Sequence, residues 1–144
     1  MRKFLFATAL SVTLETGCCA LSSAETWNCV EAKVIIDLDQ RRVELIVPSL
    51  SYDVLIVDGA RGPLGGKCPV VCGNSLVPFE QFVDFIDDSV RFGFRAIGPV
   101  GVRLQATHPG AAYVSYTLLR NGRLTGRLTA ITGDGDRKSE FCRK

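Results

Sequence analysis

Cysteine is the residue type with the clearest chemistry in this chain, which has 144 residues and six cysteines. Two of the cysteines stand side by side near the N-terminus, and the others are spread over the rest of the chain. An even number of cysteines in a small exported domain is typical of a disulfide framework. Cys18 and Cys19 lie in a segment that we expect to be removed, as argued below. The four later cysteines allow three pairings, of which we favour Cys29–Cys142 and Cys68–Cys72. The first pair would tie the two ends of the domain together, and the second would close a small ring.

The segment "CPVVC" at 68–72 is also open to two other interpretations. Zinc sites place paired cysteines at this spacing, but they need a second pair or histidines, and the only histidine is His108. Thiol-redox motifs have two residues between the cysteines, whereas this segment has three. We therefore predict no metal site and no organic cofactor.

Motifs for catalysis are missing from the sequence, including the Gly-x-Ser-x-Gly elbow, the phosphate-binding loop, the dinucleotide fingerprint and HExxH. Asp87 and Asp88 are adjacent, so a strand would point them to opposite faces. Asp134 and Asp136 are too few oxygen ligands for a calcium loop. The sequence therefore predicts a protein that is not an enzyme.

Arginine is the second residue type with a chemical pattern. In "LLRNGRLTGRLT" at 118–129, arginines and threonines alternate with leucines, as on the two faces of a strand. The same alternation in two other segments predicts that five arginines project outward from three strands: Arg91, Arg95, Arg103, Arg123 and Arg127.

This arginine set has two interpretations, an ordinary solvated sheet face and a binding surface. Any antiparallel sheet has a solvated face, and arginine with threonine suits one. As a binding surface, the guanidinium groups would bind an anionic envelope component, such as an acidic glycan, a lipid phosphate or an acidic protein. Nucleic acid is not expected, because the band lacks outward aromatic side chains for base stacking.

The N-terminus has the three parts of a secretory signal peptide. Arg2 and Lys3 precede the apolar run 4–14, and Ala24 ends a small-residue cleavage site. We therefore expect residues 1–24 to be removed, leaving a single domain over 25–144 that is periplasmic or secreted. The apolar run is about half of the roughly 20 residues that a membrane span needs.

Gly17 and Cys18 suggest an alternative, because they resemble the end of a bacterial lipoprotein signal. That motif has an aliphatic residue three positions before the cysteine, where this chain has Glu15. Acylation of Cys18 would produce a lipid-anchored protein.

Apolar alternation around polar turns predicts three hairpins, over 32–47, 82–94 and 113–128. The third contains Asn121-Gly122, which indicates a two-residue type I′ turn. Further strands are expected at 51–59 and in "VRLQA" at 102–106. These segments give about eight strands, and they predict an all-β, disulfide-stabilised domain that is an antiparallel sandwich or a small barrel.

Two segments leave the secondary structure open. "PFEQFVDFIDD" at 78–88 fits both a helix and a strand, and its phenylalanines and valine favour the hairpin. Any helix is expected only there. The segment 58–75 is dense in glycine and proline, so we expect a long irregular loop that is either functional or a tolerated insertion.

Two resemblances to known proteins remain. Cys29 in a first strand, the late "YTLLRNGRLTGRLT" and Cys142 near the end resemble small exported bacterial β-proteins without an assigned activity. "DGARG" is similar to the Ser-Gly-x-x-Tyr-type loop of periplasmic inhibitors of c-type lysozyme, with Asp58 and Gly62 in place of the serine and the tyrosine. This likeness implies an alternative function, inhibition of an enzyme by the 58–75 loop, with Asp58, Gly59 and Arg61 as candidate contacts.

Overall fold

The computed structural model describes residues 24–62, 65–67 and 77–144, and strands dominate it. The strands of the N-terminal half are β1 (Ala24–Cys29), β2 (Lys33–Asp37), β3 (Arg42–Val47), β4 (Tyr52–Val57), β5 (Arg61–Gly62) and β6 (Gly65–Lys67). Those of the C-terminal half are β7 (Phe79–Ile86), β8 (Ser89–Ala96), β9 (Tyr113–Asn121), β10 (Thr125–Thr132) and β11 (Arg137–Arg143). The helices are the 3-10 helix η1 (Pro48–Leu50), α2 (Gly98–Thr107) and α3 (Pro109–Ala112). The predicted all-β class is confirmed.

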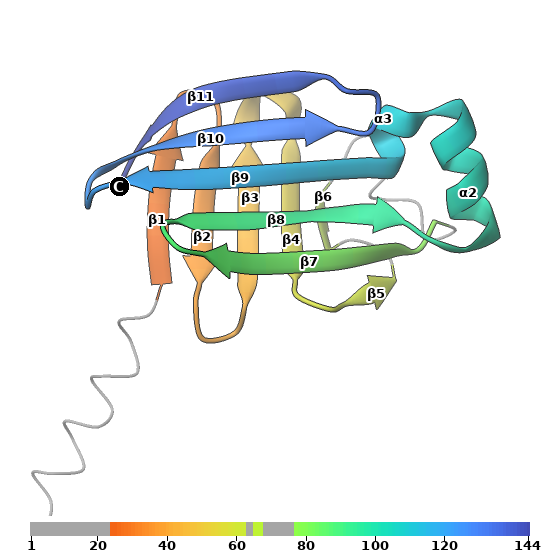
Figure 1. Cartoon of the computed structure of the whole chain (residues 1–144), viewed down its shortest axis with the longest axis horizontal. Coiled ribbons are helices and arrows are strands. Elements are labelled where there is room, and N and C mark those ends of the chain that lie inside the picture. The colour runs from red at the N-terminus through yellow and green to blue at the C-terminus, as the bar shows by residue number, and fades with distance from the viewer. Residues whose placement is uncertain (1–23, 63–64, 68–76) are drawn as a thin grey trace, which may run out of the picture.

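All of these strands belong to one antiparallel sheet, in the order β5-β7-β8-β9-β10-β11-β1-β2-β3-β4-β6. The sheet curls into a half-barrel, and Figure 1 shows strands β7–β11 crossing in front of β1–β4. The predicted count of eight strands and the sandwich are wrong. Two separate sheets cannot form because β1 pairs with β2 on one side and with β11 on the other. The barrel prediction is confirmed only in its coarser form, as a curled sheet.

The first and last strands meet at the predicted disulfide. Cys29 lies directly opposite Cys142, and their sulfur atoms are bonded. The ladder between β1 and β11 contains one more pair, Asn28 with Arg143. The disulfide therefore fixes the two halves of the sheet to each other at a short ladder. The predicted Cys68–Cys72 bond lies outside the described residues.

The core lies inside the half-barrel and is built from the apolar positions of the alternating strands. Buried side chains occupy every second position in β2, β3 and β4, as the alternation predicts. The largest fully buried side chains are Trp27, Phe79 and Phe92. One continuous core therefore connects both halves of the sheet.

A second seam joins β4 to β7, and several of the hydrogen bonds across it involve side chains. The side-chain oxygen of Gln81 accepts a hydrogen bond from the backbone N–H of Val57 at 2.9 Å. The carboxylate of Asp58 accepts one from the N–H of Val83 at 2.9 Å. Arg41 donates to the Val83 carbonyl at 2.7 Å and to Asp58 at 2.9 Å. The polar groups that a bend in the chain leaves unpaired are thus satisfied without a regular ladder.

Two element predictions near the helices are settled by the structure. Segment 78–88 forms β7 and its turn, so the preferred hairpin is confirmed. The predicted strand at 102–106 is wrong, because these residues belong to α2, and helix is therefore not confined to 78–88. Pro99 suits a first helical turn, and Gly101 packs against the backbone of Ala96, where a Cβ atom would lie 2.6 Å from a carbonyl carbon. Among the described residues, no helix is long and apolar enough to cross a membrane.

The third hairpin turns over three residues instead of two. Asn121 pairs with Thr125, which leaves 122–124 as the loop, with Gly122 at a φ of 84°. The predicted type I′ turn is therefore wrong, and the loop has the length of the next most common hairpin class. The alternation of leucines with arginines in 118–129 places Leu124 on the core face, but it stands in the turn with 67% of its surface exposed.

Candidate functional site

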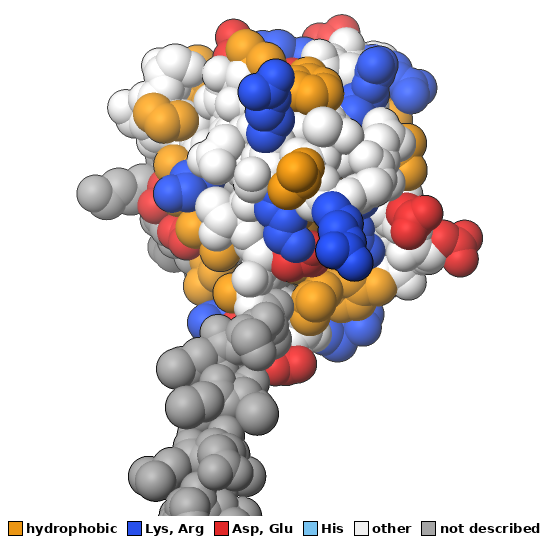
Figure 2. Space-filling view, turned by 90° about the vertical axis from the view of Figure 1, so that its left-hand side faces the viewer, with side chains coloured by type: hydrophobic (Ala, Val, Ile, Leu, Met, Phe, Trp, Pro, Cys, Tyr) orange, Lys and Arg blue, Asp and Glu red, His pale blue; other side chains and the backbone are white. Residues whose placement is uncertain are grey.

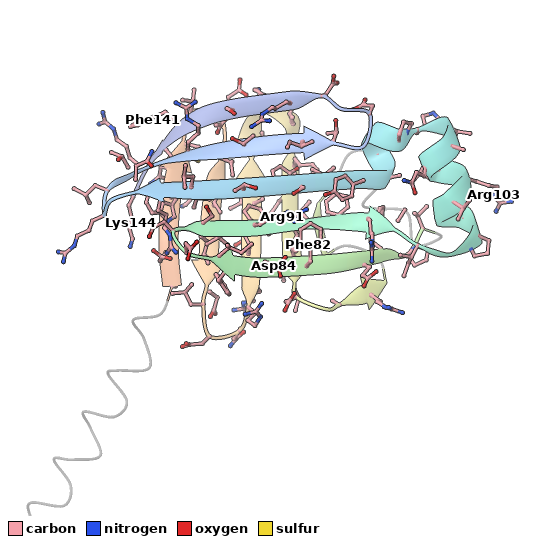
Figure 3. All side chains as sticks on the ribbon, in the orientation of Figure 1. Phe82, Asp84, Arg91, Arg103, Phe141 and Lys144 are labelled. Carbon is pink, nitrogen blue, oxygen red and sulfur yellow. A yellow bond between two sulfur atoms is a disulfide. The ribbon has the colours of Figure 1, made fainter. Side chains whose placement is uncertain are left out.

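The five predicted arginines do not form one band, because they come from two strands, one turn and one helix. Arg91 and Arg95 project from the outer face of β8, and Arg127 from that of β10. Arg123 lies in the β9–β10 turn, and Arg103 lies on α2, which Figure 3 places at the opposite end of the molecule. The sheet therefore brings only Arg91 and Arg95 together on one strand.

These two arginines line a shallow hollow on the outer face of β7, β8 and β9. The hollow has a volume of about 280 Å³. Its six lining residues combine two guanidinium groups, two carboxylates and two aromatic rings: Arg91, Arg95, Glu80, Asp84, Phe82 and Tyr113. Such a mixture offers both charged and apolar contacts to one small group.

Arg91 is held in the hollow by neutral partners. Its Nε donates to the Ser115 hydroxyl at 3.2 Å, and its Nη2 donates to the Tyr113 hydroxyl at 3.3 Å. The guanidinium carbon lies 5.4 Å from the centre of the Phe82 ring, which is a cation–π contact. A guanidinium group has five N–H donors, so these two bonds leave others for a ligand. Within the described residues, Arg91 has no ion-pair partner.

Arg95 differs because its charge is already balanced. Its Nε and Nη2 both donate to one carboxylate oxygen of Glu80, at 3.1 and 2.8 Å. Arg61 approaches the other oxygen of the same carboxylate at 3.8 Å. The hydrogen bonds and the charge of Arg95 hold the pKa of Glu80 below its usual value. Arg95 and Glu80 therefore form a fixed wall of the hollow, beside the free donors of Arg91.

The candidate loop residues have mainly structural contacts. The Val83 N–H and the Arg41 guanidinium hold the pKa of Asp58 below its usual value. Gly59 has a φ of 77°, where only glycine is unstrained, and its N–H donates to the Gln81 carbonyl at 3.0 Å. Only Arg61 projects outward, with 70% of its side chain exposed. The pairing of β5 and β6 with β7 and β4 also shows that the 58–75 segment is partly regular.

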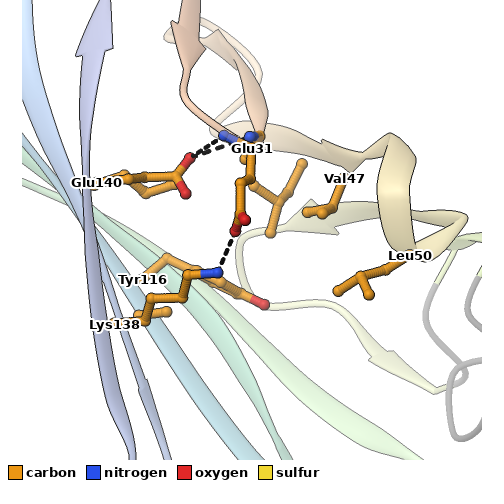
Figure 4. A pocket seen from close by; sticks show the side chains of 10 residues that line it. Glu31, Val47, Leu50, Tyr116, Lys138 and Glu140 are labelled. Atoms are coloured by element: carbon orange, nitrogen blue, oxygen red, sulfur yellow. Dashed lines mark hydrogen bonds and ion pairs between the residues drawn. The ribbon is translucent and has the colours of Figure 1, made fainter.

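A second, smaller cavity opens on the inner side of the half-barrel (Figure 4). It has a volume of about 160 Å³, and Leu45 and Leu128 form part of its apolar wall. At its rim Lys138 pairs with Glu31, while Glu140 accepts two backbone N–H groups of the β1–β2 turn at 3.1 and 3.2 Å. Lys138 and Glu31 therefore balance each other, and Glu140 is satisfied by backbone N–H groups.

Tyr116 also lines this inner cavity and is held by aromatic neighbours. Its hydroxyl lies 3.5 Å from that of Tyr52, and its ring stacks on Phe92 with 5.3 Å between centroids. Burial raises the pKa of both tyrosines, so both phenols are neutral at physiological pH. The inner cavity is thus an extension of the core with a closed polar rim, and the outer hollow is the better candidate site.

Comparison with known proteins adds nothing to this assignment: no family model, no curated protein and no solved structure matches the chain. The two resemblances noted in the sequence therefore remain expectations.

Four of the six lining residues of the outer hollow were not singled out as site residues from the sequence: Glu80, Phe82, Asp84 and Tyr113. Neither was Ser115, the partner of Arg91. Phe82 alternates with the buried Gln81 and Val83, which marks it as outward-facing. It lies directly opposite Gly93, which has no side chain to occupy the space. The expectation that the arginine strands lack outward aromatic neighbours is therefore wrong, since Phe82 lies against Arg91. Tyr113 and Ser115 reach the site only through the β8–β9 register.

Proposed function

We propose that this protein is a non-enzymatic binding domain that holds an anionic group of an envelope component in the outer hollow. One observation carries the proposal: Arg91 is oriented by Ser115, Tyr113 and Phe82 while several of its N–H donors stay free. A planar guanidinium group with two parallel free donors suits a carboxylate or a phosphate.

An acidic glycan fits this hollow best among the anionic ligands. The Asp84 carboxylate can accept hydrogen bonds from sugar hydroxyl groups. The ring of Phe82 offers an apolar surface for the C–H face of a sugar ring. A bare phosphate would use Arg91, but it has no sugar hydroxyl groups for Asp84 and no apolar face for Phe82. The mixed lining therefore favours a ligand that has hydroxyl groups as well as a charge.

The test compares an oligosaccharide of uronic acids with its carboxyl-reduced, neutral form. We expect Arg91→Gln to weaken binding of the acidic form by about tenfold or more, since a charged hydrogen bond is worth about 1.5–3 kcal/mol. Arg103→Gln, on α2, is the matched control and should bind like the wild type. Binding should also weaken as salt rises. Equal binding of the acidic and neutral forms would contradict the proposal.

Export remains part of this proposal. β1 begins at Ala24, so cleavage after Ala24 would remove one residue of the strand and leave Glu25 paired with Ile36. A disulfide between the first and last strands also suits an oxidising compartment. The N-terminal sequence and thiol content of the protein recovered from outside the cytoplasm would test it. An acylated Cys18 would instead support the lipid-anchored alternative.

Inhibition of an enzyme is the second candidate function, and the exposure of Arg61 favours it. This side chain projects from β5 with 70% of its surface exposed, and its ion pair with Glu80 among the described residues is long, at 3.8 Å. Arg61→Ala should then abolish capture of the target enzyme, such as a c-type lysozyme, while Arg91→Gln leaves it intact. If Arg61→Ala changes nothing, this function is excluded.

A further inference from the structure

We infer that a second surface, at the end of the molecule that carries the β9–β10 turn, docks on an anionic lipid bilayer. This surface, the tip patch, consists of three basic and three apolar side chains: Arg123, Arg127, Arg143, Leu119, Leu124 and Phe141. It shares no residue with the outer hollow around Arg91, so the inference does not rest on the proposed function.

The apolar members of the tip patch are unusually exposed. Leu124 is 67% exposed, Phe141 50% and Leu119 43%. Arg127 lies directly opposite both Leu119 and Phe141, so the three form one row across β9, β10 and β11. The N–H of Lys144 donates to the Leu124 carbonyl at 2.9 Å, which brings the end of β11 beside the turn. Large apolar side chains gathered in this way mark interaction surfaces.

The basic members leave an excess of positive charge. In the described part of the chain, Arg123, Arg127 and Arg143 have no ion-pair partner. The guanidinium group of Arg143 lies 5.6 Å from the centre of the Phe141 ring, so charge and apolar surface are in contact. Figure 2 looks onto this end of the molecule and shows basic side chains interleaved with hydrophobic ones.

Acidic groups at the same end are either neutralised or peripheral. Glu25 is 12% exposed at its side chain and is held by Arg120 and Lys144, each at 3.0 Å. Asp87 and Asp88 lie in the neighbouring β7–β8 turn and limit the patch on that side. The field that a ligand meets at the tip patch is therefore positive.

A bilayer fits this surface better than a folded partner. Leu124 stands in a projecting turn, and arginines separate the apolar side chains from one another. A protein partner would need a matching pocket for each one, whereas a bilayer accepts isolated apolar side chains between its head groups. Arginines can at the same time keep their guanidinium groups at the lipid phosphates.

The helical end of the molecule provides a matched control. There Val102 is 69% exposed and is followed by the exposed Arg103, as Leu124 follows Arg123. Figure 3 places Arg103 at the end opposite Lys144. The pair Val102–Arg103 thus has the same chemistry as one part of the tip patch but lies on a different surface.

The test measures co-flotation of the full chain with vesicles of phosphatidylcholine alone and of phosphatidylcholine mixed with phosphatidylglycerol. We expect binding to the mixed vesicles that Leu124→Ser weakens about tenfold. Arg123→Gln and Arg127→Gln should weaken it about fivefold each, since a basic residue near an anionic surface contributes about 1 kcal/mol. Val102→Ser and Arg103→Gln should bind like the wild type.

The apolar run 4–14 is common to all of these variants, so differences between them report the tip patch. A second measurement uses Leu124→Trp, whose added tryptophan fluorescence should shift to shorter wavelength on the mixed vesicles, whereas that of Val102→Trp should not. The inference is overturned if the tip variants bind as the wild type does, or if the helical controls lose as much. A loss with Arg91→Gln of the same size would assign lipid binding to the outer hollow instead.

Discussion

The half-barrel is held together at two seams that differ in their chemistry. Between β1 and β11 a two-pair ladder is reinforced by the Cys29–Cys142 disulfide. Between β4 and β7 there is no covalent bond, and Asp58 and Gln81 replace missing ladder contacts with side-chain hydrogen bonds. The first seam stabilises by limiting the unfolded chain. The second stabilises by satisfying buried backbone groups of the folded chain.

The two seams should therefore respond differently to pH and to reduction. The disulfide seam acts regardless of pH, because a bonded cysteine does not titrate. The Asp58 seam depends in part on a carboxylate whose charge strengthens its contacts with Arg41 and with the Val83 N–H. Conditions that weaken one seam should therefore leave the other unchanged, and three experiments test that separation.

The largest expected effect is loss of the disulfide. Replacing Cys29 and Cys142 by Ala opens a link between residues 113 positions apart. A loop of about 100 residues corresponds to about 4–5 kcal/mol of the free energy of unfolding. Urea denaturation should show that loss, and the reduced wild-type protein should match the variant. A loss below about 1 kcal/mol would show that the β1–β11 ladder holds without the bond.

The next effect is expected at Asp58. Asp58→Ala leaves the Val83 N–H without an acceptor, which should cost about 1–3 kcal/mol. Asp58→Asn is the matched control, because its amide oxygen can still accept that hydrogen bond while the charge is lost. It should therefore retain more stability than Asp58→Ala. Equal stability of the two variants in urea denaturation would contradict the role of the acceptor.

The smallest effect is the pH dependence of the second seam. The Val83 N–H and Arg41 keep the pKa of Asp58 lower in the folded chain than in the unfolded one. This stabilisation is complete above the unfolded pKa, near 4, and is lost as the pH falls through the lower folded value. The difference in unfolding free energy between wild type and Asp58→Asn should therefore shrink below about pH 4. If the difference in unfolding free energy did not change with pH, the Asp58 carboxylate would not be a source of the acid sensitivity.

The sequence predicted the fold class because alternation marks the strands directly, as in β2, β3 and β4. It also predicted the pairing of Cys29 with Cys142. It failed at α2, where the residues of "VRLQA" alternate as in a strand but form a helix, in which Gly101 packs against Ala96. That contact lies between α2 and the end of β8, and the periodicity of apolar residues carries no information about it.

The sequence predicted the part of the candidate site that lies on a single strand, but not the part that depends on how strands pair. Arg91 and Arg95 could be identified from alternation within one strand. The separation of Arg103 and Arg123 from them depended on one helix and one extra loop residue. Tyr113 and Ser115 reach Arg91 only because of the register between β8 and β9, which local sequence does not determine.

The pairing of β1 with β11 has a consequence for the order of folding. The first strand of the sheet lies between β2 and the last strand, so part of its ladder must wait until the C-terminal residues are available. Contacts between such distant segments form late, because a long loop must close first. A chain emerging from the ribosome would thus keep its N-terminal strand incompletely paired until synthesis is nearly finished.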